Sequence, residues 1–302
     1  MEFIDKAQRW FKSSNLLVRF ITVNVGVLAV LGVAFLCGLG VGSTVAMWTV
    51  MLPSDLHQLL LRPWTVLTYM FAHVSVWHLL FNMLWLYWLG RIFLEYFTPK
   101  QFGGLYVLGG LGGAALFVAA YNLLPVLTGR ETFLIGASAS VLAIVVGVAA
   151  YVPDYKVNLL FWGGVSLKWI AIIMIGLDVL NINVATDGIT PNIGGHIAHV
   201  GGALTGLWFA LAMRKGHDVT AGLNRVIDAV ASVCSGRKRR VGKPAGGRAY
   251  TYGESSRPAS QGMGKGPSEA EIDRILGKLK TSGFDALSDE EKDTLFSASR
   301  KK

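Results

Sequence analysis

Long apolar runs, separated by short polar or glycine-rich stretches, dominate the first 213 residues of the chain. A bilayer core about 30 Å thick needs roughly 20 apolar residues for each helix that crosses it. We therefore predict an all-α membrane protein, a bundle of six transmembrane helices. The predicted spans lie at about residues 18–40, 73–94, 102–123, 135–152, 168–184 and 193–213.

Two connections between these spans have patterns of their own. Residues 41–72 are too interrupted to cross a membrane and too apolar to form a free loop, so we predict a membrane-embedded first loop at the interface, with Trp48 and Trp64 at headgroup depth. Residues 155–168 hold a glycine pair between two short apolar strands, which predicts a β-hairpin. The alternative, an early start of the fifth helix, would place Lys168 deep in lipid at high cost.

Beyond the sixth span the pattern changes, and the chain is expected to divide into four parts. A helical membrane domain, residues 1–214, precedes an amphipathic juxtamembrane helix, residues 215–234, whose apolar side chains recur at helical spacing. Residues 235–267 are basic and rich in Gly, Ser and Pro, which is typical of a flexible linker. Residues 268–302 follow as a separate C-terminal part.

This last part predicts a small helical hairpin. Its turn falls at Gly283, and its second helix begins with Ser288 followed three residues later by Glu291, the pattern of a capping box. So few residues bury little apolar surface by themselves. We expect the hairpin to associate with a protein partner or with a second copy of itself.

Composition supports the membrane assignment: 52% of residues are hydrophobic, 16% are charged and the mean hydropathy is +0.47, which excludes an ordinary soluble domain. The net charge of +9 belongs mostly to the tail, since residues 1–213 hold 10 basic and 8 acidic residues and residues 214–302 hold 18 and 11. The basic clusters between spans fall on one side of a six-span bundle. We therefore predict a multi-pass protein of a bacterial cytoplasmic membrane with both termini cytoplasmic, a retained N-terminal anchor, and no nucleic-acid partner.

Polar side chains inside predicted spans are costly and therefore mark functional sites. The second span holds His73, His78 and Asn82, and the spacing of four between the last two places them on one helical face. The fourth span begins at a serine, Ser138. The sixth contains two histidines, of which His199 is the second.

These side chains form the set that hydrolysis of an amide requires, namely a nucleophile, a base and donors for the developing oxyanion. Two stripes of small residues predict that the fourth and sixth spans pack against each other. In the sixth span Gly202 and Gly206 form a GxxxG surface, and in the fourth the stripe is Ser140, Ala143 and Gly147. Small residues let helices pack closely, and that contact is expected to bring the sixth span's histidine to Ser138.

With HxxxxHxxxN at 73–82, GxSx at 136–139 and HxxGxxxG at 199–206, the chain resembles the rhomboid intramembrane serine proteases over residues 18–213. The resemblance implies a rhomboid bundle that cleaves transmembrane or membrane-proximal segments of membrane proteins within the lipid bilayer. It implies a catalytic dyad without a third, acidic member. The implied roles are Ser138 as nucleophile, His199 as base, His78, Asn82 and the Ser138 N–H as oxyanion donors, and His73, Gly136, Gly202 and Gly206 as supporting residues.

Plainer readings stay open for several of these residues. Ser140 is expected to bond a backbone carbonyl one turn back, and His196 to link helices. Metal binding by the four histidines of the spans has neither an HExxH motif nor a carboxylate ligand beside it, so we expect no metal and no cofactor. The alternative function is a non-catalytic, rhomboid-like protein that binds membrane clients, but such proteins typically lack the serine or the histidine kept here.

Overall fold

The chain is described from a computed structural model. It forms two units, residues 1–239 and residues 240–302, which are treated separately. Within them the structure describes residues 2–36, 48–159, 163–185, 192–234 and 269–282, together with residues 288, 290, 291 and 294.

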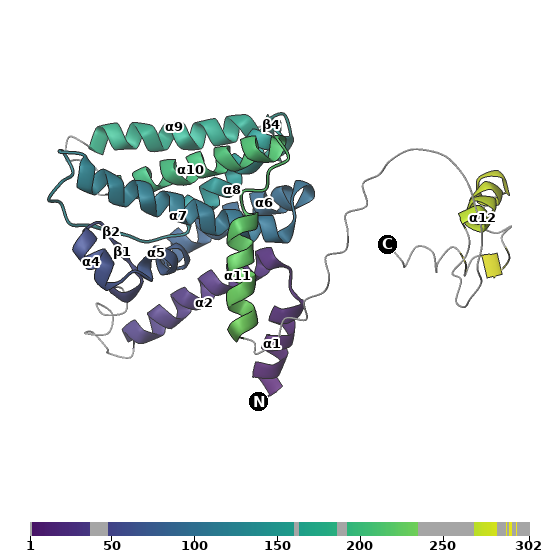
Figure 1. Ribbon diagram of the computed structural model, residues 1–302, viewed down its shortest axis with the longest axis horizontal. Helices are drawn as coiled ribbons and strands as arrows, with labels where there is room; N and C mark the ends of the chain where they lie inside the picture. The colour runs from purple at the N-terminus through teal and green to yellow at the C-terminus, as the bar shows by residue number, and fades with distance from the viewer. Residues whose placement is uncertain are drawn as a thin grey trace. The chain divides into compact units, whose positions relative to one another are not determined.

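Helices fill the predicted spans of the first unit (Figure 1). They are α2 (Leu16–Leu36), α6 (Val76–Tyr96), α7 (Pro99–Leu123), α8 (Ser138–Tyr151), α9 (Leu167–Ala185) and α10 (Ile193–Arg214), with α1 (Glu2–Ser13) before them and α11 (Ala221–Cys234) after them. Among the described helices, α2, α7 and α10 are each long and apolar enough to cross a membrane alone. The helical bundle is therefore confirmed, while six crossings stay a prediction.

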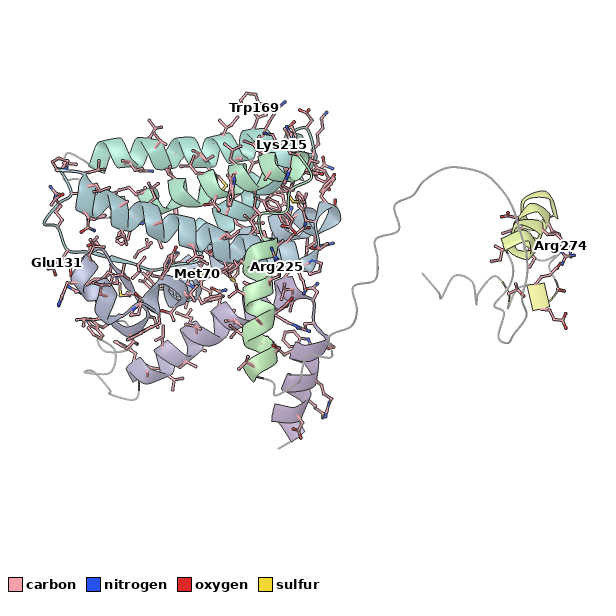
Figure 2. The ribbon with its side chains drawn as sticks, in the orientation of Figure 1. Met70, Glu131, Trp169, Lys215, Arg225 and Arg274 are labelled. Carbon is pink, nitrogen blue, oxygen red and sulfur yellow. The ribbon has the colours of Figure 1, made fainter. Side chains whose placement is uncertain are left out.

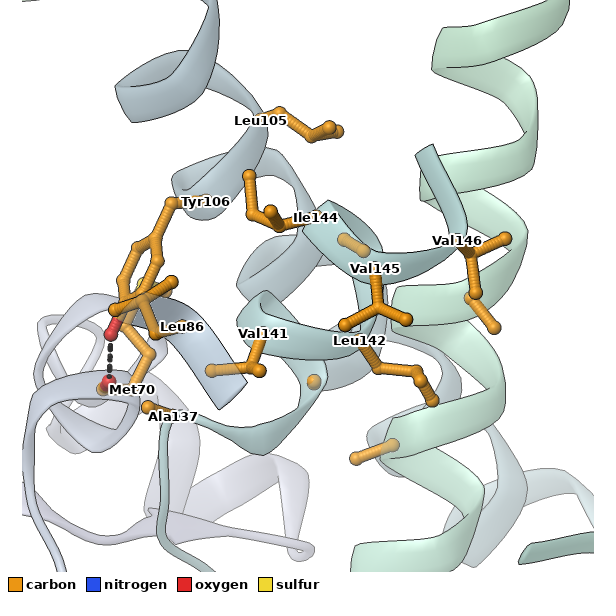
Figure 3. Packing of buried hydrophobic residues seen from close by; sticks show 14 of the residues in the cluster. Met70, Leu86, Leu105, Tyr106, Ala137, Val141, Leu142, Ile144, Val145 and Val146 are labelled. Carbon is orange, nitrogen blue, oxygen red and sulfur yellow. Dashed lines mark hydrogen bonds between the residues drawn. The ribbon is translucent and has the colours of Figure 1, made fainter. Parts of the chain in front are cut away.

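The short helix α8 lies at the centre of the bundle and is buried on every side. All eleven residues from Ala139 to Ala149 are buried, and α8 contacts α6, α7, α9 and α10. A helix that is apolar all round is expected to be enclosed by other helices. Figure 3 shows its side chains Val141, Ile144 and Val145 among their neighbours, so the start of α8 is held by packing from several directions.

Glycines let α10 lie directly against α8. A Cβ atom added at Gly202 would overlap the carbonyl oxygen of Ala139, and one added at Gly206 would overlap that of Ala143. The predicted GxxxG contact is therefore present. The predicted stripe on α8 was partly wrong, because Ser140 faces Gly110 of α7 and Ala139 takes its place against α10.

The first loop is tied to the bundle by hydrogen bonds. Its elements are β1 (Leu52–Pro53), α4 (Leu56–Leu61), α5 (Thr65–Thr68) and η1 (Tyr69–Phe71), and β1 pairs antiparallel with β2 (Phe133–Leu134). The Tyr69 hydroxyl donates to the Gly110 carbonyl at 2.7 Å. The Tyr106 hydroxyl donates to the Met70 carbonyl, also at 2.7 Å (Figure 3). The α5–η1 segment meets α6 at an angle of 89°. Embedding of this loop in lipid stays a prediction.

A buried arginine also holds the first loop together. Arg62 is fully buried, and its guanidinium lies 3.8 Å from the ring centroid of Trp48. The same group donates to the Gln58 side chain at 2.6 Å. A cation over an indole face is attracted by the ring quadrupole. This contact fixes the start of the described loop against the residues that precede α5.

The predicted β-hairpin is confirmed, although Gly163 and Gly164 lie in its second strand and not between the strands. Strands β3 (Lys156–Leu159) and β4 (Gly163–Ser166) pair antiparallel, and α9 begins directly after them. Lys168, in the first turn of α9, lies 2.6 Å from Asp154, and this bond lowers the pKa of the Asp154 carboxyl. Trp169 points outward beside it (Figure 2). Lys168 is thus a partly exposed residue at the start of α9.

A helix is present in the juxtamembrane segment, where α11 packs on the start of α7. Asp228 pairs with Lys100 at 2.6 Å, Asn224 donates to the Lys100 carbonyl at 3.1 Å, and Thr220 lies against Gly104. The apolar side chains Val226, Ile227, Val230 and Val233 are exposed. An exposed apolar stripe suits a helix lying on a membrane surface, which stays a prediction.

The second unit contains α12 (Glu269–Ser282), within the predicted hairpin. The predicted capping box is present: the Glu291 N–H donates to the Ser288 hydroxyl at 3.3 Å, and the Ser288 N–H donates to the Glu291 carboxylate at 3.0 Å. The predicted linker and the turn at Gly283 lie outside the described residues. The division of the chain into four parts and the association of the hairpin stay predictions.

The α8–α10 contact can be tested with one methyl group. Gly206→Ala would push a Cβ atom into the Ala143 carbonyl, and overpacking of this kind costs about 1–3 kcal/mol. We expect a lower midpoint of thermal unfolding in detergent. Gly176→Ala on α9 is the matched control, because nothing lies within 4 Å of the added atom. Equal midpoints for the two variants would contradict a close glycine contact.

Candidate active site

Ser138 is the first residue of α8, where the chain turns from β2 into the helix. Two residues earlier, Gly136 has a φ of +132°, a conformation that side chains with a Cβ rarely adopt. The Gly136 N–H donates to the Tyr69 carbonyl at 3.0 Å. The first N–H groups of a helix have no partner within it and favour negative charge. The Ser138 hydroxyl thus lies at a helix N-terminus and is partly exposed.

His78 lies beside this turn, and Gly136 provides the space for it. A Cβ atom at Gly136 would come within 2.7 Å of His78 Cε1 and 2.9 Å of its Nε2. Ser75 caps α6 by accepting the His78 N–H at 3.1 Å, which fixes where the helix carrying His78 begins. The His73 ring is buried and meets the His78 ring nearly edge-on, with centroids 5.0 Å apart.

Asn82 lies one turn further along α6 and is buried. Its side-chain N–H donates to the His78 carbonyl at 2.9 Å. A primary amide carries two N–H groups, and this bond uses one of them. The contacts of Asn82 therefore tie it to the His78 turn of its own helix. Ser140 is fully buried against α7, and its hydroxyl has no hydrogen-bond partner among the described residues, so the expected bond to a carbonyl one turn back was wrong.

His199 meets Ser138 directly. The distance from His199 Nε2 to Ser138 Oγ is 2.6 Å, although 61 residues separate them in the chain. The helix contact explains this approach, because Gly202 rests on the Ala139 carbonyl, one residue after the serine. The predicted pair of serine and histidine is thus brought within hydrogen-bonding distance.

The histidine also has an acidic neighbour, which corrects the expectation of a dyad without one. Asp178 Oδ1 lies 2.8 Å from His199 Nδ1 and also 2.8 Å from His196 Nδ1. Asp178 comes from α9 and is 9% exposed. Sequence reasoning missed it although a signal was available, since Asp178 is the one acidic residue within the six predicted spans.

Comparison with known families identifies the bundle. A model of the rhomboid domain matches residues 61–216, just over half of the chain, and this match contains all the residues above. The chain belongs to the rhomboid family. This family assignment agrees with the three motifs, which lie at the starts of α6 and α8 and on α10. The fold brings them to one place.

Curated relatives of this rhomboid-family chain include two named as mitochondrial. The chain is 32% identical over 162 residues to RHOMBOID-like protein 12, mitochondrial, of Arabidopsis thaliana, covering 50% of this chain and 47% of that protein. It is 28% identical over 155 residues to Presenilin-associated rhomboid-like protein A, mitochondrial, of Danio rerio, covering 49% and 36%. It is 31% identical over 153 residues to RHOMBOID-like protein 2 of Arabidopsis thaliana, covering 50% and 43%. The match thus spans less than half the length of each relative.

Three side chains near Ser138 carry atoms of the kind that bind metal ions. The side-chain ligand atoms of Asp178, His196 and His199 all lie within 4.8 Å of one another. The expectation that no carboxylate accompanies the histidines was therefore wrong. Donor atoms on one tetrahedral zinc at about 2.0–2.1 Å from it lie about 3.3 Å apart. The two nitrogen–oxygen distances of 2.8 Å are shorter and fit hydrogen bonds.

Gly136 offers a test of how the serine turn is built. Gly136→Ala would combine the strain of a positive φ, about 1–3 kcal/mol, with overlap on the His78 ring. We expect a lower midpoint of thermal unfolding than for the control Gly129→Ala. Gly129 has a φ of +82° but nothing within 4 Å of an added Cβ atom, so it carries the strain without the overlap. A Gly136 variant no less stable than the control would contradict the close approach of His78.

Proposed function

We propose that this rhomboid-family chain is an intramembrane serine endopeptidase that cleaves transmembrane or membrane-proximal segments of membrane proteins. The observation that carries the proposal is the 2.6 Å contact between His199 Nε2 and Ser138 Oγ. A hydroxyl becomes an effective nucleophile when a base within hydrogen-bonding reach can take its proton. Both side chains are partly exposed, so a substrate has a way to reach them.

The reaction proceeds in two halves that share one base. Ser138 Oγ attacks the carbonyl carbon of the peptide bond while its proton passes to His199 Nε2. The C–N bond then breaks, and the same proton goes to the departing amine nitrogen, which leaves an ester on the serine. Water gives a proton to His199, attacks the ester and releases the new carboxyl end, and the proton returns to the serine.

The developing oxyanion needs donors on the other side of the carbonyl. We assign this role to the Ser138 N–H at the start of α8, the His78 ring and the second side-chain N–H of Asn82. The packing of His78 against Gly136 and the bond from Asn82 to the His78 carbonyl support the assignment, because both fix donors beside the serine turn. Preorganised donors lower the barrier because they need no reorientation as charge develops.

The length of α8 supports cleavage within the membrane. Its 14 residues span about 21 Å at 1.5 Å per residue, less than the roughly 30 Å of a bilayer core. If the Tyr151 end lies at one surface, Ser138 lies below the other. The basic clusters favour cytoplasmic termini, and a bacterial cytoplasmic membrane is the location we propose.

Removing either member of the pair is expected to abolish the activity. Ser138→Ala and His199→Ala should each lower cleavage of a model transmembrane substrate by more than about 10³-fold, since nucleophile and base act as one unit. Labelling by a fluorophosphonate probe should disappear in parallel. The control Ser140→Ala removes a serine two residues away that faces α7, and it should label like the wild type.

The same cleavage and labelling measurements also distinguish the proposed protease from the alternative function. A folded wild-type chain that neither labels nor cleaves would favour a non-catalytic protein that binds membrane clients. Strong labelling of Ser138→Ala would mean that another serine is the nucleophile.

The oxyanion assignment predicts a selective loss of rate. His78→Ala and Asn82→Ala should each lower kcat by about 10²–10³-fold, the usual effect of removing one such donor. Steady-state kinetics on the same substrate, with thermal unfolding as a check of the fold, measures this. A kcat close to that of the wild type in both variants would exclude the donor role.

A further inference from the structure

We propose that Asp178 is a positioning residue of this active site, which fixes the tautomer and orientation of His199, and that His196 holds the carboxylate in place. The inference rests on the proposed function and deepens it. Its basis is the pair of 2.8 Å contacts from Asp178 Oδ1, one to the Nδ1 atom of each histidine. The three side chains come from two helices, α9 and α10, that pack against each other.

The carboxylate decides which nitrogen of His199 carries the proton. An ionised carboxylate only accepts hydrogen bonds, so a neutral His199 beside it must place its proton on Nδ1. Nε2 is then left with its lone pair, 2.6 Å from the Ser138 hydroxyl. A histidine tautomer is set in this way by the bond that the other ring nitrogen makes. The base is therefore ready to take a proton before a substrate arrives.

The same contact acts again when the base becomes charged. After taking the serine proton, His199 is an imidazolium whose two N–H groups point at Asp178 and at the reacting atoms. A carboxylate at hydrogen-bonding distance from this cation stabilises it, and more strongly where water is scarce. Asp178 is 9% exposed, so the negative charge lies where this stabilisation is little screened.

His196 holds the Asp178 carboxylate in its position beside His199. It lies three residues before His199 on α10, and its Nδ1 contacts the same oxygen of Asp178. The two imidazole rings are nearly perpendicular, with centroids 5.9 Å apart. A carboxylate held by a second donor cannot rotate away without breaking that bond. His196 thus supports the carboxylate, a more specific role than the general link between helices expected from the sequence.

The variant Asp178→Asn tests the proposal because it keeps the shape of the side chain. Its amide can donate to Nδ1 and so favour the tautomer with a proton on Nε2, which cannot accept from Ser138. In a soluble serine protease the equivalent change lowers kcat about 10⁴-fold. We expect kcat on a model transmembrane substrate to fall by about 10²–10⁴-fold, with KM within about threefold of the wild-type value. The control Asp154→Asn removes an exposed carboxylate paired with Lys168 and should leave both constants unchanged.

A spectroscopic measurement separates positioning from mere helix packing. The ¹⁵N spectrum of histidine-labelled protein, with His199 assigned by comparison with His199→Gln, should show a protonated Nδ1 and an unprotonated Nε2 near neutral pH. Asp178→Asn should reverse that pattern. A wild-type His199 protonated on Nε2 would overturn the proposal, even if the Asn variant failed to fold. So would a normal kcat in a folded Asp178→Asn protein.

Two further outcomes distinguish a failure of the positioning role from a failure of the proposed protease and from a metal site. An inactive wild type would overturn the proposed protease, whereas the ¹⁵N spectrum would still decide the tautomer. Treatment with EDTA should leave wild-type activity unchanged. Loss of activity with EDTA that zinc alone restores would assign Asp178, His196 and His199 to a metal site and overturn the positioning role.

Discussion

The close contact between α8 and α10 is the constraint on which the rest of the site depends. Gly202 and Gly206 bring the backbone of α10 against the Ala139 and Ala143 carbonyls. No side chain lies between the helices at these points, so their separation and register are set by backbone atoms. His199 is less than one turn from Gly202, and Ser138 precedes Ala139. The 2.6 Å approach of the histidine to the serine therefore follows from packing.

The first loop also holds the turn at Gly136, which precedes Ser138. The first loop is bonded to α7 through the two tyrosine hydroxyls, and Tyr69 also accepts the Gly136 N–H. A turn with a positive φ is costly unless its surroundings hold it. Here the loop, α6 and α8 all contact it, which keeps His78 and the start of α8 in one arrangement.

Much of this was predictable because membrane insertion leaves strong signals in a sequence. Long apolar runs gave the helices, and the cost of polar groups in lipid singled out Ser138, His78 and His199. The hairpin at β3–β4 followed from a glycine pair and from the cost of burying Lys168. These inferences depend on local composition and on spacing along one helix, which a single sequence contains.

Features that depend on contacts between distant segments were harder to predict. Asp178 satisfied the rule for costly polar groups, but only the packing of α9 on α10 shows that it faces His199. Arg62 is buried over the Trp48 ring, and nothing in the local sequence of the predicted first loop indicates this contact. The choice of Ala139 over Ser140 for the α10 contact depends on the rotation of α8 about its axis, which its uniformly apolar sequence does not specify.

The shortness of α8 has a consequence for the supply of water. The hydrolysis that we propose consumes one water molecule for each bond cut, and the apolar core of a membrane holds almost none. A helix of about 21 Å in a core of about 30 Å places its first residue roughly 9 Å below the nearer surface when its other end is at the far one. That distance is only a few water diameters. The partly exposed polar groups at the start of α8 can therefore be hydrated from the aqueous phase, while the apolar remainder of the helix closes the path to the opposite side.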